Sequence, residues 1–198
     1  MRLLLVRHGL SEWNATGRWQ GWADPPLTDL GRQQALAAAR GVGAVDVLVA
    51  SDLQRARETA EIIGESVGMG PVLVDEGLRE RHVGEYTGLT RAEIEERWPG
   101  ALASYADPPG GETRDEVVAR VLDVISRLAE AHPGADVLAV SHGGIIRYLE
   151  RHLGEERPPL PNLAGVEVSV HGDGRIKVSD RVLLIDPDEV ALTVPHQL

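Results

Sequence analysis

The chain has 198 residues, 42% of them hydrophobic, which is enough for one full core and suits a single domain over residues 1–198. Its 20 Lys and Arg against 31 Asp and Glu give a formal net charge of -11, which argues against nucleic acids and anionic membranes as partners. The absence of cysteine excludes disulfides, thiolate metal sites and cysteine nucleophiles. An anionic ligand of this chain therefore needs a local cluster of basic side chains.

The first residues, MRLLLVRHG, form a short apolar run that is followed at once by Arg7 and His8. The run is too short to span a membrane, and it lacks the longer apolar region and small-residue cleavage site of a signal peptide. We therefore expect a cytoplasmic protein that does not bind membranes.

Short runs rich in Val and Leu alternate with helical patterns along the chain, which is typical of repeated βαβ units. We predict an α/β fold: a three-layer sandwich in which a mostly parallel sheet carries helices on both faces. The expected strands are Leu3–Val6, Val45–Ala50, Val72–Val74 and Val137–Val140.

Several helices have clear start and stop signals. Apolar residues at alternating spacings of three and four predict an amphipathic helix from Ser51 to a stop at Gly68. Capping-box pairs, Thr90 with Glu93 and Thr113 with Glu116, predict two further helix starts, and Pro133-Gly134 ends the second of these helices.

The rest of the chain is predicted to contain one long loop, one hairpin and a tail. Residues 99–112 are rich in proline and glycine and long enough to be a functional loop, such as a lid. Val166–Val170 and Ile176–Ile185 flank His171-Gly172-Asp173-Gly174, which is typical of a hairpin. We expect the final residues to form a loose tail. No internal repeat or linker indicates a second domain.

Two histidines directly follow two of the predicted strands. Arg7-His8-Gly9 comes after the first strand, and Ser141-His142-Gly143-Gly144 comes after Val137–Val140. Because ligands bind beyond the carboxyl ends of strands in open α/β sheets, the two histidines could meet at one edge. The glycines allow close approach of a ligand, and the helix expected near Gly144 would present N–H groups to an anion. These features predict a phosphate site.

Other charged side chains are expected at the same edge. Arg55 lies in the first turn of the helix after Ser51, whereas Arg57 lies about 200° around that helix and cannot face the same site. Arg7 and Arg55 could hold phosphoryl oxygens while one imidazole attacks the phosphorus. Glu80, in the irregular stretch 77–84, is the candidate acid that protonates the leaving oxygen and then activates water.

Five motifs, taken in order, resemble the histidine phosphatase (phosphoglycerate-mutase-like) family. They are Arg7-His8-Gly9 with Ser11 and Asn14, Leu27-Thr28-x-x-Gly31, Ser51-Asp52-Leu53-x-Arg55-Ala56-x-x-Thr59-Ala60, Leu78-x-Glu80, and Ser141-His142-Gly143. The resemblance implies a phosphatase in which His8 is the nucleophile and carries the phosphoryl group. It implies Glu80 as the proton donor and a phosphate pocket formed by Arg7, Arg55 and His142, with Asn14 as a further contact. Gly143 is expected to bind substrate because its small size lets the backbone approach a ligand. The resemblance also implies a small phosphorylated metabolite as substrate, with no metal and no other cofactor.

The same family contains phosphoglycerate mutases, which carry a tyrosine shortly after the acid and adjacent arginines in an insertion. This chain has Val83 where the mutases have the tyrosine, and residues 98–107, where the insertion would lie, contain no arginine. The phosphatase interpretation is therefore preferred over a cofactor-dependent mutase. A catalytically silent phosphate-binding protein is a third alternative, which the proton donor Glu80 argues against.

Several other features have simpler interpretations. Gly64-x-Ser66-x-Gly68 matches a serine-hydrolase elbow but sits at a helix end, so Ser66 is expected on the surface. No H-x-x-x-H spacing indicates a metal site. His82 could line the leaving-group pocket or face solvent, and Arg79 and Arg81 are expected in ion pairs. The four tryptophans, Trp13, Trp19, Trp22 and Trp98, are expected in the core or the pocket wall. A homodimer through the C-terminal hairpin remains open.

Overall fold

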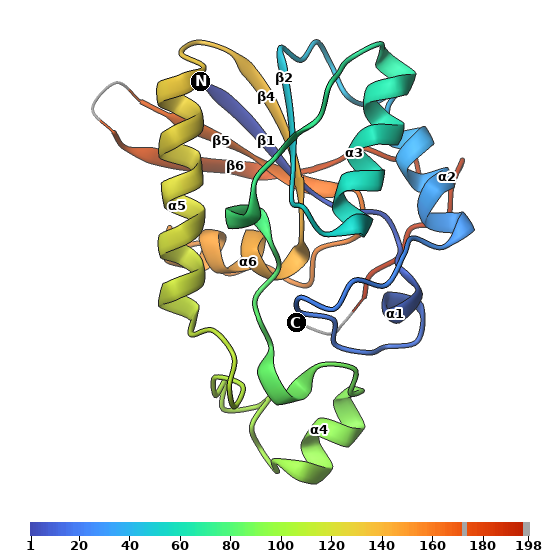
Figure 1. Ribbon diagram of the computed structural model, residues 1–198, viewed down its shortest axis with the longest axis vertical. Coiled ribbons are helices and arrows are strands. Elements are labelled where there is room, and N and C mark those ends of the chain that lie inside the picture. The colour runs from blue at the N-terminus through green and yellow to red at the C-terminus, as the bar shows by residue number, and fades with distance from the viewer. Residues whose placement is uncertain (172–173, 196–198) are drawn as a thin grey trace.

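The computed structural model describes residues 1–171 and 174–195, and its centre is a six-stranded sheet of order β3-β2-β4-β1-β5-β6 (Figure 1). The strands are β1 Arg2–Arg7, β2 Val47–Ala50, β3 Leu73–Val74, β4 Asp136–Ser141, β5 Ala164–Val170 and β6 Ile176–Leu183. Strands β1 to β4 run parallel, β5 is antiparallel to β1, and β6 is antiparallel to β5. The mostly parallel sheet expected from the sequence is confirmed.

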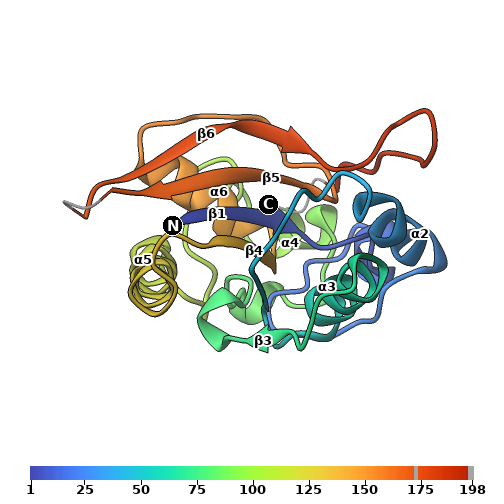
Figure 2. The same cartoon turned by 90° about the horizontal axis from the view of Figure 1, so that it is seen from above.

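Helices cover both faces of this sheet, which confirms the predicted three-layer sandwich (Figure 2). Helices α2 (Asp29–Ala38) and α3 (Gln54–Val67) lie on one face, and α5 (Arg114–Ala131) and α6 (Gly143–His152) lie on the other. Successive residues of β1 point to opposite faces, so its side chains join two separate apolar clusters. Within the described residues, no helix is both long and apolar enough to cross a membrane.

Helix α3 follows β2, as the sequence predicts, although it begins at Gln54 and not at Ser51. The backbone N–H of Gln54 donates to Asp24 Oδ1, so a side chain from another loop caps the helix. Gly68 ends the helix in the left-handed region at φ 71°. Ser66 is exposed on the last turn and donates its hydroxyl to Ile62 O, so it forms no nucleophile elbow.

The segment between β3 and α5 leaves the sheet and forms a small structure of its own at one end of the molecule (Figure 1). It contains the 3₁₀ turns η1 (Glu76–Leu78) and η2 (Gly84–Tyr86) and helix α4 (Arg91–Arg97). A third apolar cluster holds it together and includes Trp19, which comes from the loop after α1 (Glu12–Ala15). Both predicted capping boxes, at the starts of α4 and α5, are present. This segment places Glu80 opposite the carboxyl edge of the sheet.

The C-terminal part of the chain forms the predicted hairpin of β5 and β6, although β6 ends at Leu183. Positions 172–173 of the predicted turn and 196–198 of the predicted tail lie outside the described residues. The expectation of a loose tail is wrong for Thr193. Its hydroxyl donates to Oδ1 of buried Asn162, at 2.7 Å, and its carbonyl accepts from Asn162 N, at 2.9 Å. Burial of a polar side chain requires such partners, so this part of the chain is held in place.

Candidate active site

The pairing of β1 with β4 brings the two predicted histidines together. Arg7 lies opposite Ser141 in the parallel register, so His8 and His142 leave the sheet side by side. Their ring centroids are 5.2 Å apart and the ring planes meet at 64°. Both side chains are buried. The prediction that two strand ends meet at one edge is therefore confirmed.

The hydrogen bonds of His8 define its protonation state. Nδ1 lies 2.6 Å from Gly9 O and donates to it, because a carbonyl oxygen can only accept. Nε2 therefore carries the lone pair, and Arg55 Nε donates to it from 3.3 Å. Burial lowers the pKa of His8 well below its usual range, and the positive charges of Arg55 and Arg7 lower it further. His8 is a neutral imidazole whose Nε2 is available as a nucleophile.

Arg55 enters the site from the first turn of α3, where the sequence placed it. Its Nη1 and Nη2 atoms donate to Ala23 O and Gly21 O, each at 2.9 Å. Thr59, one turn on, donates to Arg55 O and accepts from Gly9 N, so it ties α3 to the loop after β1. Burial lowers the pKa of Arg55 to about 10, which leaves the side chain charged at neutral pH. Arg57 is exposed and pairs with Glu61, as its position on the helix predicts.

Arg7 is fixed between β1 and the start of α6. Its Nη1 donates to Leu160 O at 2.5 Å, and burial lowers its pKa to about 10. A Cβ atom at Gly143 would come within 3.1 Å of three guanidinium atoms of Arg7. A side chain at this position would therefore press on the Arg7 guanidinium group, which lies against the Gly143 backbone.

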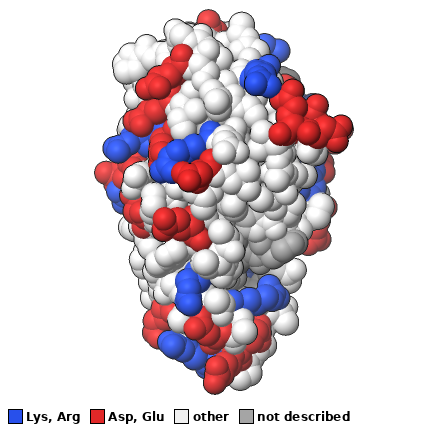
Figure 3. Space-filling model, turned by 90° about the vertical axis from the view of Figure 1, so that its right-hand side faces the viewer, with Lys and Arg blue, Asp and Glu red and all other residues white. Residues whose placement is uncertain are grey.

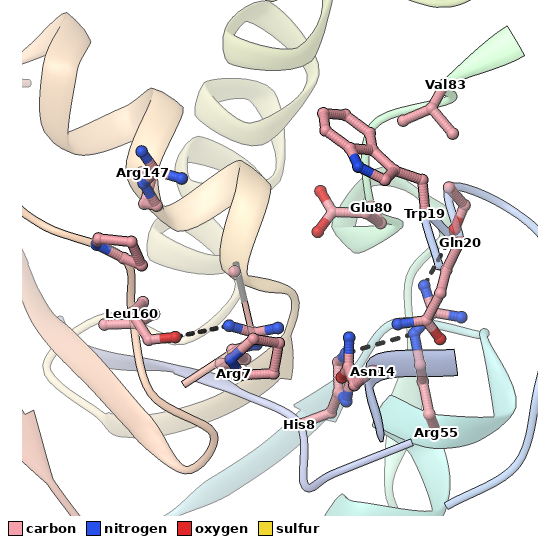
Figure 4. A pocket seen from close by; sticks show the side chains of 14 residues that line it. Arg7, His8, Asn14, Trp19, Gln20, Arg55, Glu80, Val83, Arg147 and Leu160 are labelled. Atoms are coloured by element: carbon pink, nitrogen blue, oxygen red, sulfur yellow. Dashed lines mark hydrogen bonds between the residues drawn. The ribbon is translucent and has the colours of Figure 1, made fainter. Parts of the chain in front are cut away.

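Glu80 faces the histidines from the segment outside the sheet. Its Oε2 accepts from Gly144 N at 2.9 Å, at the start of α6, and its Oε1 accepts from Arg81 N at 2.8 Å. Its carbonyl accepts from Trp22 Nε1 and from Arg120. Figure 4 shows the Glu80 carboxylate and the His8 ring around one cavity. These bonds hold a carboxylate opposite an imidazole without joining the two.

We call this cavity, of about 30 Å³, the phosphate pocket. Six of the seven predicted site residues line it: Arg7, His8, Asn14, Arg55, Glu80 and Gly143. His142 does not line it but packs edge-on against His8. Both ring nitrogens of His142 and Nε of Arg7 are buried without a hydrogen-bond partner among the described residues. Unpartnered buried donors are costly, so Arg7 Nε and the protonated ring nitrogen of His142 indicate where ligand oxygens would bind.

Trp19 lines the phosphate pocket, as expected for a core or pocket-wall residue. Further lining residues were not predicted from the sequence: Gln20, Gly21, Val83, Arg147, Pro159, Leu160 and Pro195. Gln20 accepts from Ser11 Oγ through its Oε1, and so its amide N–H groups are directed elsewhere. Arg147 lies one turn after Gly143 on α6, so helical spacing could have identified it. Gln20 and Pro195 lie in irregular segments, where no periodic pattern indicates a position.

The residues beside Glu80 have structural contacts. Arg79 pairs with Asp52 and Arg81 pairs with Asp107, as expected. The His82 ring packs on Trp22, with centroids 4.9 Å apart, and does not line the phosphate pocket. Trp22 is 41% exposed, so the expectation of a core or pocket-wall position is wrong for it. It covers the backbone of the segment that carries Glu80.

The described part of the chain contains no cluster of three His, Asp or Glu residues with the geometry of a metal site. Acidic and basic side chains are mixed on the face that carries α2 and α3, and Figure 3 shows no extended basic patch among the described residues there.

A family model of the histidine phosphatase superfamily (branch 1) matches residues 3–174. The chain belongs to the histidine phosphatase superfamily. This match confirms the family predicted from the five motifs.

Three relatives show the range of activities in the superfamily. A glucosyl-3-phosphoglycerate phosphatase of Mycobacterium tuberculosis is 41% identical over 167 residues, which cover 77% of this chain and 74% of that protein. A metal-independent phosphoserine phosphatase of Arabidopsis thaliana is 37% identical, over 73% of this chain and 65% of that protein. A 2,3-bisphosphoglycerate-dependent phosphoglycerate mutase of Methylobacterium sp. is 39% identical, over 74% of this chain and 77% of that protein.

Among solved structures, a mycobacterial glucosyl-3-phosphoglycerate phosphatase in complex with VO3 superposes with a TM-score of 0.84. The two sequences are 34% identical, and the match covers 93% of this chain and 99% of the solved one. The fold and the enzyme class predicted from the sequence, a phosphoric monoester hydrolase of the histidine phosphatase superfamily, are confirmed.

One of the five motifs has a packing role. The Thr28 hydroxyl accepts from Gly31 N and donates to Leu10 O, so it caps α2 against the loop that holds His8. A Cβ atom at Gly31 would lie 2.1 Å from Leu10 O, and one at Gly9 would lie 2.5 Å from Gly31 O. The motif Leu27-Thr28-x-x-Gly31 therefore allows α2 to pack on the loop that follows β1 and contains His8.

Proposed function

We propose that the protein hydrolyses phosphate monoesters of small metabolites through a phosphohistidine on His8. The observation that carries this proposal is the state of His8 Nε2, which has its lone pair, lies in the phosphate pocket and is held by Arg55. Glu80 lines the same pocket and supplies the acid that the leaving group requires. A binding protein would need the arginines but not this acid.

In the first step, His8 Nε2 attacks the phosphorus and the bond to the ester oxygen breaks. Glu80, in its protonated form, gives its proton to the departing oxygen, so a neutral alcohol leaves. Arg7, Arg55, Asn14 and His142, with the backbone of Gly143, stabilise the phosphoryl oxygens. The partnerless nitrogens of His142 and Arg7 support this role, since a phosphoryl oxygen would supply the missing acceptor.

In the second step, water attacks the phosphorus of phosphohistidine. Glu80, now a carboxylate, accepts a proton from that water, the bond between phosphorus and Nε2 breaks, and inorganic phosphate leaves. His8 returns to the neutral form, and Glu80 is again protonated. Both steps use charge already present in the pocket, so we propose that neither requires a metal or another cofactor.

The nearest alternative is a mutase, which passes the phosphoryl group to another hydroxyl. By the resemblance, mutases of the family carry a tyrosine shortly after the acid. Here Val83 occupies that place and lines the phosphate pocket. This supports water, and not a second substrate hydroxyl, as the acceptor. The relatives named as phosphatases for glucosyl-3-phosphoglycerate and phosphoserine suggest a small phosphorylated metabolite as substrate.

Other aspects of the sequence interpretation are also proposals. We infer that residues 1–198 form one domain, because Thr193, near the end of the chain, bonds to Asn162, which in turn donates to His8 O. We place the protein in the cytoplasm because the first apolar run forms the central strand β1 and is part of the core. A homodimer through the hairpin of β5 and β6 stays a prediction.

Release of inorganic phosphate tests this function directly. We expect phosphate release from phosphorylated metabolites without added 2,3-bisphosphoglycerate and in the presence of EDTA. Turnover that needs the bisphosphate and leaves the phosphate esterified would indicate a mutase. Binding of vanadate or phosphate with no release from any ester would indicate a silent phosphate-binding protein.

A further inference from the structure

A second cavity, of about 260 Å³, adjoins the phosphate pocket. Trp19, Arg147 and Pro159 line both, and Gly144, beside the Glu80 carboxylate, lines the second cavity. The two cavities are therefore neighbours on the side of the acid. A leaving group bonded to a phosphoryl group in the first would extend into the second.

Arginines predominate in the lining of the second cavity, in contrast to the chain as a whole, although Asp107 pairs with Arg81 and lies 3.9 Å from Arg114. Five arginines line it, and no Asp or Glu of the described residues does so. The whole chain has a formal net charge of -11. The five are Arg81, Arg91, Arg114, Arg147 and Arg151. Positive charges gathered in a concave site favour an anion there, because its low-dielectric walls focus the field.

Two of these arginines, Arg147 and Arg151, lie one turn apart on the same face of α6. Like charges at this spacing repel each other, and Arg147 is half-buried. Burial and the charge of Arg151 lower the pKa of Arg147. The carboxylate that Arg151 meets lies 3.8 Å away, on the highly exposed Glu156. An anionic group bound between the two arginines would be attracted by both charges.

Tyr105, in the loop 99–112, positions the cations at the mouth of the cavity. Its ring lies 5.1 Å from the guanidinium carbon of Arg151 and 5.7 Å from that of Arg114. Its φ is 55°, a strained conformation for a bulky residue, and more than half of its surface is exposed. Strained residues that persist at a cavity mouth mark functional positions. Here the strain places one ring against two guanidinium groups.

We propose that the second cavity binds an anionic group on the leaving part of the substrate, a carboxylate or a second phosphoryl group, through Arg147 and Arg151. This inference rests on the proposed function, since it assigns the other end of the same substrate. It makes Arg151 a specificity-determining residue: hydrolysis of esters with an anionic leaving group depends on it, and hydrolysis of neutral ones does not.

The test compares substrates that share a primary phosphate and differ at the other end. 3-Phosphoglycerate carries a carboxylate where glycerol 3-phosphate carries a hydroxymethyl group, and propane-1,3-diol bisphosphate adds a second phosphoryl group to 3-hydroxypropyl phosphate. We expect Arg151→Gln to lower kcat/KM for an anionic member about 10- to 100-fold, mainly through KM, and for its neutral partner less than about threefold. The pair with the larger loss identifies the anion.

Arg97→Gln provides the matched control, because it removes an exposed arginine at the end of α4 and does not line either cavity. We expect equal, small effects of this change on all four substrates. Equal losses on anionic and neutral substrates in Arg151→Gln would overturn the inference alone. A wild-type enzyme that releases phosphate from no ester would overturn both the proposed function and the inference.

Discussion

The phosphate pocket and the second cavity lie side by side but are built differently. In the phosphate pocket, buried groups from β1, α3 and α6 are fixed by bonds to backbone atoms, such as those of Arg55 to Gly21 and Ala23. In the second cavity, two of the five arginines, Arg114 and Arg151, pack against the ring of one loop residue, Tyr105. Three of the basic groups in the first pocket come from the sandwich and are joined there by Glu80, whereas the second cavity lies between α6 and the segment outside the sheet.

This difference suggests that the phosphate pocket carries out the reaction and that the second cavity selects the leaving group. A pocket fixed by the sheet suits the phosphoryl group, which is common to all substrates, whereas a wall formed by a loop suits the part that varies. Changes in the phosphate pocket should therefore affect every phosphate ester. Changes in the second cavity should affect esters according to their leaving group.

The largest effect is expected for His8→Ala, which removes the nucleophile. Activity should fall at least about 10⁴-fold on every ester, because no other group in the phosphate pocket can form the covalent intermediate. His132→Ala, at the end of α5, is the control and should change activity less than about twofold. Residual turnover in His8→Ala that still depends on the charge of the leaving group would show that the second cavity promotes hydrolysis without His8. That result would contradict the assignment of the reaction to the phosphate pocket alone.

Glu80 lies where the two spaces meet, so its effect should depend on the acidity of the leaving group. Glu80→Gln should slow hydrolysis of alkyl phosphates about 10²- to 10⁴-fold, the usual range for general acid catalysis. An acidic phenol needs little protonation, so the pre-steady-state burst from an aryl phosphate should fall much less. The burst separates the two steps, since Glu80 is also proposed to act in the second. Equal slowing of alkyl and aryl bursts would exclude Glu80 as the acid and direct attention to Glu12 or Glu112.

Arg55 and Arg57 allow a matched test on one helix. Arg55→Lys loses the fork that contacts His8 and two carbonyls, so kcat/KM should fall about 10²-fold on all esters. Arg57→Lys, two residues on and exposed, should change it less than about twofold. Comparable losses in the two variants would mean that Arg55 acts through fold stability alone, which urea unfolding of both variants would reveal.

A smaller effect is expected for Gly143→Ala. The new methyl group would lie 3.1 Å from the Arg7 guanidinium, which must shift by a few tenths of an ångström. We expect kcat/KM to fall about threefold to tenfold, equally on anionic and neutral esters, because only the phosphate pocket is disturbed. Gly43→Ala is the control, since its Cβ would meet no described atom within 4 Å. A loss confined to anionic esters would contradict the separation of the two sites.

The burial of His8 and His142 predicts a pH-dependent stability. Burial and Arg55 depress the pKa of both His8 and His142 in the folded chain. Below the ordinary histidine pKa of about 6.5, the unfolded chain binds protons that the folded chain does not. Each histidine should then lower the free energy of unfolding by about 1.4 kcal/mol per pH unit, down to its folded pKa. Urea unfolding between pH 7 and 5 should give a shallower slope in His142→Gln, and an unchanged slope would contradict the assignment.

The sequence predicted the phosphate pocket better than the second cavity, for a physical reason. Arg7, His8 and His142 directly follow buried strands, and Arg55 opens a helix behind another, so strand pattern and parallel topology bring them to one edge. Glu80 lies on no helix or strand, so it was predicted from its chemistry and from the family resemblance.

Contacts between distant irregular segments could not be predicted in this way. Thr193 bonds to Asn162 and Gln34, and Pro195 lines the phosphate pocket, although no periodic pattern marks these positions. The loop 99–112 was expected to be functional, yet the φ of 55° that turns Tyr105 toward Arg151 has no sequence signal in a bulky residue. Its proposed action as a lid stays a prediction.

The central claim is that His8 carries the phosphoryl group, and trapping that intermediate tests it most directly. The enzyme is mixed with a phosphate ester and quenched within milliseconds into alkaline denaturant, in which phosphohistidine survives, and its peptides are mapped by mass spectrometry. The account predicts one phosphoryl group on His8 in the wild-type chain and none in His8→Ala. Phosphate on another residue such as Ser66, or turnover with no phosphorylated peptide at any time, would contradict it.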